Sequence, residues 1–154
     1  MVEFVDRSSQ AAADLLGALD RETEALDLVV LRSRTLMLLH ATGSIDFVGR
    51  ASSELDQASV LLDRCSIERS NAIDAAKVEW DIEPQTASEL VATAPAEVSS
   101  LIGERFDRAR DLLDEYMAVS ETIKELVATR SESVARRRSE LERAQRGEVT
   151  YRAR

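Results

Sequence analysis

Apolar residues recur every three or four positions along most of the chain, and this spacing predicts long amphipathic helices. The first predicted helix spans residues 6–42, with Ser8 or Ser9 as its N-cap. Gly43 is expected to end it, because glycine tolerates the left-handed conformation of a helix C-cap. The second predicted helix spans residues 45–80. Many positions in its heptad pattern are small, so a neighbouring helix is expected to approach it closely.

Two prolines divide the next part of the chain. Pro84 interrupts the helical pattern, since proline lacks a backbone donor and disfavours helix at the residue before it. Thr86 is followed by glutamate three residues later, which is the spacing of a capping box, and predicts a short helix over residues 86–92. Pro95 suits the first turn of a further helix, predicted over residues 95–145.

The last predicted helix keeps the three–four alternation longest. Its predicted seam is Ile102, Phe106, Ala109, Leu113, Tyr116, Ser120, Ile123, Val127, Arg130, Val134, Arg137, Leu141 and Ala144. Up to Val127 the seam is a good core stripe, and beyond it arginines take alternate positions. Gly147 is expected to end the helix and to leave residues 148–154 as a flexible tail.

The helix lengths predict the fold class. At about 1.5 Å per residue, the last helix is about 20 Å longer than the hairpin formed by the first two. We therefore expect an all-α fold: an elongated antiparallel bundle of three long helices with a short connecting helix. It forms a single domain over residues 1–147, and the C-terminal helix overhangs the bundle.

The charge of the chain changes sign at this overhang. Residues 130–154 contain eight arginines and four glutamates, a net charge of +4, whereas the whole chain carries −9. Residues 1–129 therefore carry −13. Such an acidic body argues against general nucleic-acid binding, which requires a basic face.

The sequence offers little catalytic chemistry. It has one histidine and one cysteine, no glycine-rich phosphate loop and no Glu-x-x-His pair, so we predict no enzyme activity, no cofactor and no metal site. Cys65 falls on the seam of the second helix and is expected to be a buried structural thiol. An acidic N-terminus and the lack of a long apolar run predict a cytoplasmic protein without membrane insertion.

The stretch "DIEPQTASELVATAPAEVSSLIGERFDRARDLLDEYM" has an organisation that resembles the FlgN family of flagellar type III export chaperones. The residues that match the central pattern of the family are Pro84, Thr86, Ser88, Glu89, Leu90 and Pro95. The preceding "DRCSIERSNAIDAA" is similar to the end of the second helix in the family. The resemblance spans roughly residues 8–142. Where the family tends to have an asparagine-rich patch, this chain has "SETIKE".

The resemblance implies a cytosolic chaperone for the hook-associated proteins at the hook–filament junction. Such a chaperone holds the disordered terminal helices of its clients and presents them to a component of the export gate. The family uses its last helix and C-terminal tail for these contacts.

Periodicity and charge suggest which residues of the overhang bind a partner. Val134 and Leu141 would supply apolar anchors, and Tyr151 would anchor a tail that orders on binding. Arg130, Arg137 and Arg138 would pair with acidic groups. The complete predicted partner-binding set is Ile123, Val127, Arg130, Val134, Arg137, Arg138, Leu141 and Tyr151.

Three alternatives remain open at this stage. The chain could be a non-enzymatic coiled-coil scaffold that dimerises through its C-terminal end, since polar seam positions often set oligomeric state. It could act on nucleic acid through "ARRRSELERAQR", or it could be a regulatory subunit of an enzyme. We expect a monomer or a weak homodimer.

Overall fold

The computed structural model describes the backbone of residues 2–152 and the side chains of residues 7–147. Within that range the chain forms α-helices and one 3-10 turn, without strands, which confirms the predicted all-α class. The elements in order are α1 (Val2–Thr42), η1 (Ile45–Phe47), α2 (Val48–Trp80), α3 (Ala87–Thr93) and α4 (Ala96–Arg152).

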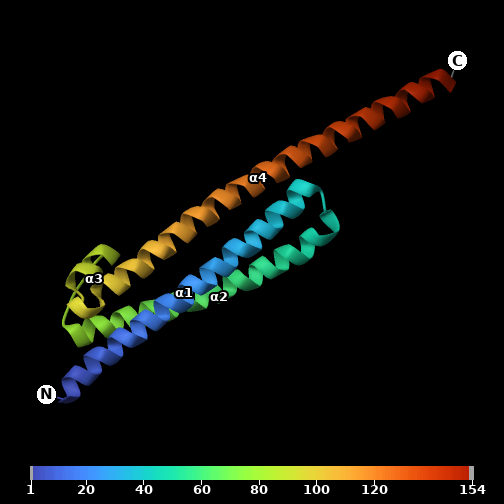
Figure 1. The fold of residues 1–154 in the computed structure, drawn as a ribbon. Helices are drawn as coiled ribbons and strands as arrows, with labels where there is room; N and C mark the ends of the chain where they lie inside the picture. Colours follow the sequence, from blue (N-terminus) through green and yellow to red (C-terminus); the bar gives the residue numbers. More distant parts are fainter. Residues whose placement is uncertain (1, 153–154) are drawn as a thin grey trace.

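Helix α1 is the central element. Helix α2 folds back along it as an antiparallel hairpin, and α4 runs beside α1 in the same direction (Figure 1). Both α2 and α4 pack on α1, and the described parts of α2 and α4 have no close backbone contact with each other. Accordingly, ten of the 18 buried apolar residues within residues 7–147 belong to α1. The last helix thus depends mainly on one neighbour for its packing.

Within residues 7–147, the core includes two apolar clusters, and both contain residues of α1. The cluster at the α3 end brings together residues from all four α-helices, namely Leu15, Leu19, Ala76, Leu90 and Ile102. The second cluster, further along α1, consists of Leu26, Val30 and Leu112. The buried residues of α2 are Ala51, Ala58, Cys65 and Ala76. These small side chains let α2 approach α1 closely, as its pattern predicted.

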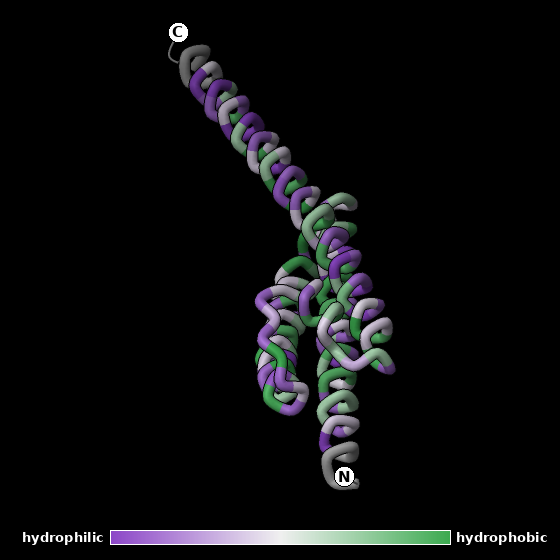
Figure 2. Tube along the Cα trace, turned by 90° about the vertical axis from the view of Figure 1, so that its left-hand side faces the viewer, coloured by the Kyte–Doolittle hydropathy of each residue, from purple (hydrophilic) through white to green (hydrophobic). Residues whose placement is uncertain are grey.

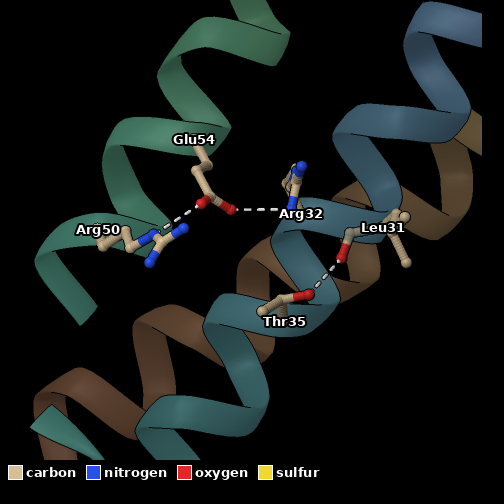
Figure 3. Close-up of polar contacts among 5 residues, drawn as sticks. All are labelled: Leu31, Arg32, Thr35, Arg50 and Glu54. Atoms are coloured by element: carbon tan, nitrogen blue, oxygen red, sulfur yellow. Dashed lines mark hydrogen bonds and ion pairs between the residues drawn. The ribbon is translucent and has the colours of Figure 1, made fainter. Parts of the chain in front are cut away.

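The ion pairs between helices agree with these helix directions. On the α4 side of α1, Asp20 pairs with Arg105 and Asp27 with Arg108, so residue numbers rise together as in parallel helices. On the α2 side, Glu54 accepts from Arg32 at 2.8 Å and from Arg50 at 3.1 Å (Figure 3). The pairs that join two helices help to set the register of those helices.

The first two helix boundaries differ in part from the predictions. Helix α1 begins at Val2, so Ser8 and Ser9 lie inside the helix and do not cap it. No residue upstream of them breaks helix, and the pattern therefore extends towards the N-terminus. Gly43 has a φ of 72° just after α1, as predicted for the residue that ends it. Helix α2 begins at Val48, because η1 occupies the first residues of the predicted range.

The break between α2 and α4 uses both predicted and unpredicted residues. Asp81, with a φ of 53°, ends α2 before Pro84 is reached. Thr86 caps α3 as predicted, since its Oγ1 accepts a hydrogen bond from the Glu89 backbone at 3.1 Å. The Glu89 carboxylate accepts from the Gln85 backbone at 2.7 Å instead of from Thr86, so the capping box is displaced by one residue.

The phase of α4 differs from the predicted seam. Leu112 is buried at 2% exposure, whereas Leu113, which the seam included, is 47% exposed. Val119, which the seam omitted, is buried at 8%. An α-helix has 3.6 residues per turn and drifts by about 20° per heptad, so a strict three–four seam does not keep facing a single neighbour. The buried apolar stripe that α4 packs against α1 is therefore shifted relative to the predicted seam.

The C-terminal end of α4 extends past the hairpin (Figure 1). We call residues 131–152 the arm, and the rest of the described chain the body. The predicted helix end at Gly147 is wrong, because α4 continues to Arg152 and includes most of the predicted flexible tail. One exposed glycine costs a helix only about 1 kcal/mol, which is too little to end it. Residues 153–154 lie outside the described residues. The arm is about 33 Å long at 1.5 Å per residue.

Candidate partner-binding surface

The arm is a helix without a neighbour in the described structure. Every residue from 131 to 147 is exposed. Among them, Val134 is 60% exposed and Leu141 is 64% exposed. Figure 2 shows short apolar segments alternating with hydrophilic turns along this part of the chain. Large apolar side chains on an exposed helix are the usual anchors for a second helix.

The exposed apolar residues of the arm continue a row that begins on the body. Leu113, Val127, Val134 and Leu141 are separated by multiples of seven residues, and each is at least 41% exposed. Residues seven apart lie on nearly the same side of a helix. Val127 was predicted as a seam residue, and the structure places it on the exposed edge of α4. Ile123, also predicted for the site, is half-buried.

A groove opens where the arm leaves the body, and we call it the fork groove. It has a volume of about 430 Å³. One wall is the end of α1, residues 40–43. The other wall belongs to α4 and consists of Leu126, Thr129, Arg130, Ser133, Val134 and Arg137. Three of the predicted site residues therefore share one groove: Arg130, Val134 and Arg137.

The charge in the fork groove is not balanced from within the groove. None of its ten lining residues is acidic. Arg130 is half-buried there, with a terminal nitrogen 3.9 Å from the position a Cβ on Gly43 would occupy. The Nδ1 atom of His40, on the same wall as Gly43, is buried without a hydrogen-bond partner. The groove therefore carries the positive charges of Arg130 and Arg137.

The remaining predicted site residues have other surroundings. Arg138 donates to Glu142 at 3.1 Å within the arm, so its charge is already paired one turn away. Tyr151 is on the last turn of α4, and its side chain lies outside the described side chains. Sequence reasoning missed the contribution of His40 and Gly43. Nothing local signals it, since these residues meet α4 only through the packing of α4 on α1.

Elsewhere the described residues offer little chemistry. Cys65 is 6% exposed, and burial raises the pKa of its thiol, with the nearby Glu68 carboxylate raising it further. Residues 7–147 contain no cluster of three or more side chains suited to a metal ion. Among the described helices, none combines the length and the apolar character that crossing a membrane requires.

Comparisons of the chain with family models, with curated proteins and with solved structures found no match.

Proposed function

We propose that this protein is a cytosolic export chaperone of the FlgN type. It binds the disordered terminal helices of flagellar hook-associated proteins and delivers them to the export gate. The resemblance at Pro84, Thr86 and Pro95 motivates the assignment. The observation that carries it is the arm, an exposed helical extension that displays Val134 and Leu141 to solvent.

The arm suits a client that is disordered before binding. A client segment gains a partner helix when it folds against Val134 and Leu141, and the burial of those side chains offsets part of the ordering cost. The apolar row is narrow, because Val134 and Leu141 are the large apolar side chains among residues 131–147. Such a surface favours a complex that can release its client at the gate, in keeping with a delivery role.

The experiment is a calorimetric titration with the terminal segments of hook-associated proteins from the same source. The full chain is compared with a version that ends at Thr129, whose helicity is checked by circular dichroism. The proposal predicts that the full chain binds and that the shortened chain binds more weakly or not at all. A folded full chain that binds none of these segments would contradict it.

A second candidate function is a coiled-coil scaffold. The seven-residue spacing of Leu113, Val127, Val134 and Leu141 favours it, because two copies of such a row can pack side by side. A scaffold predicts a stable dimer that is lost when residues 130–154 are deleted. Sedimentation equilibrium of both proteins distinguishes the candidates, since a chaperone without client is expected to be a monomer or a weak dimer.

A further inference from the structure

We infer that the fork groove is a docking site for an acidic amphipathic helix, with Arg130 and Arg137 as the paired contacts for carboxylates of the partner. The inference rests on the proposed function, because it takes the occupant of the groove to be a segment of a partner protein. It goes beyond that function by assigning the chemistry of the segment and the groove in which it docks.

The first observation is how arginines behave elsewhere in the fold. Six arginines of the body form an ion pair with an acid of a neighbouring helix. They are Arg21, Arg32, Arg34, Arg69, Arg105 and Arg108. The charge of each of these six arginines is thus matched across a contact between two helices.

Arg130, which lies against the end of α1, departs from this pattern, and Arg137 lines the same groove. Both line the fork groove, and neither forms an ion pair with an acid among residues 7–147. A half-buried guanidinium without a carboxylate, such as that of Arg130, loses hydration without full compensation. The C-terminal end of α1 offers Arg130 only the partial negative charge of the helix dipole. Arg137 lies further from this helix end, along the arm. Two carboxylates of a partner, one for each arginine, would complete these contacts.

The second observation is the spacing of the two arginines. They are seven residues apart, which is about 10.5 Å along α4. A helix packed along α4 repeats its own positions at the same interval, so two acids seven residues apart on the partner match both arginines. Val134 lies between them in sequence, and with Leu126 it provides apolar contact in the same groove. The matching partner therefore has acids flanking an apolar stripe.

Two exposed arginines provide a matched control. Arg136 and Arg143 are also seven residues apart on α4, they form no ion pair among residues 7–147, and they do not line the groove. Replacing either pair by alanine removes the same net charge from the same helix. A difference in affinity between the two double variants therefore reflects contacts in the fork groove and not the net charge of α4.

The experiment measures binding of designed peptides to the full-length protein by fluorescence anisotropy at about 0.15 M salt. The acidic probe has about 21 residues, with leucine at the a and d positions and glutamate at e and g. A second probe has glutamine in place of glutamate. We expect the acidic probe to bind more tightly than the glutamine probe. We expect Arg130→Ala/Arg137→Ala to weaken it about tenfold or more, as for lost charge-assisted contacts, and Arg136→Ala/Arg143→Ala to change it less than about threefold.

Equal weakening by the two double variants, or equal binding of the two probes, would overturn the inference. Because Arg130 is half-buried, Arg137→Ala alone is measured as well. Arg137 is exposed on the arm, so its loss leaves the body folded, and an unchanged affinity would also count against the groove.

The same proteins separate this inference from the proposed function. If hook-associated segments bind the wild type and both double variants equally, the chaperone assignment stands and the groove inference fails. If those segments do not bind while the acidic probe depends on Arg137, the docking chemistry stands and the flagellar assignment fails.

Discussion

Arg105 and Asp20 form a two-point ion pair between α4 and α1. The Arg105 Nε atom donates to Asp20 Oδ1 at 2.8 Å, and Nη2 donates to Oδ2 at 3.1 Å. The two residues are 85 positions apart in sequence. The parallel fork geometry of such a pair fixes orientation as well as distance. It therefore helps to fix the register of α4 on α1 and, with it, the point at which the arm leaves the body.

We predict that Arg105→Ala lowers the free energy of unfolding by about 1 kcal/mol, the upper range for a partly exposed pair. Thermal or urea unfolding of the full chain measures the change. Asp20→Asn should cost a similar amount, and the double variant should cost less than the sum of both. Additive effects would show that the pair contributes nothing to the packing of α4 on α1.

Two adjacent leucines test the phase of α4, that is, which side of the helix packs against α1. Leu112→Ala should lower the free energy of unfolding by about 2–4 kcal/mol, because it leaves a cavity beside Leu26 and Val30. Leu113→Ala should cost less than about 1 kcal/mol, since that side chain is 47% exposed. Urea unfolding of both variants provides the comparison. A larger loss at Leu113 would instead favour the seam that the sequence pattern predicted.

These leucines illustrate how far the sequence could predict the fold. Helix content, the break at Pro84 and the Thr86 cap follow from local signals and were predicted correctly. The phase of α4 was not predicted correctly, because it depends on which helix α4 packs against. The choice of α1 as its neighbour, in parallel orientation, leaves no trace in a heptad pattern.

The candidate site, too, was predicted from the sequence only in part. The exposed arm, with Val134 and Leu141, followed from helix lengths and periodicity. The fork groove could not be predicted, since it joins residues 40–43 to residues that follow more than 80 positions later. Gly147 was misjudged for a different reason. A glycine signals a helix end only when the residues after it prefer another conformation.

The continuation of α4 through Gly147 gives a further prediction. Gly147→Ala should stabilise the last turns of the arm by about 0.5–1 kcal/mol, because alanine loses less backbone entropy in a helix. Apart from the adjacent residues and the nearby backbone of α4, nothing lies within 4 Å of the added Cβ, so the substitution introduces no clash. Slower amide hydrogen exchange around residue 147 would report the change. Faster exchange in the variant would show that α4 does not continue there in solution.

The burial of Cys65 predicts low reactivity of its thiol. Burial raises the pKa, so at about pH 8 the folded protein contains less thiolate than the unfolded chain, and an aromatic disulfide reagent should react slowly. The urea-unfolded protein at the same pH should react rapidly. A raised folded pKa also means that the stability contribution is complete below the unfolded thiol pKa and is lost as pH rises through the folded one. Rapid reaction of the native protein would contradict the buried placement.

The central claim is that the apolar side chains of the arm bind the client. Its most direct test is calorimetric binding of hook-associated terminal segments to the full-length Val134→Ser/Leu141→Ser variant. The matched control is Ile67→Ser/Val78→Ser, which removes two exposed apolar side chains from α2. We expect the arm variant to lose about tenfold or more in affinity, in line with two lost apolar contacts, and the control to bind like the wild type. Undiminished binding by the arm variant, with helicity preserved, would contradict it.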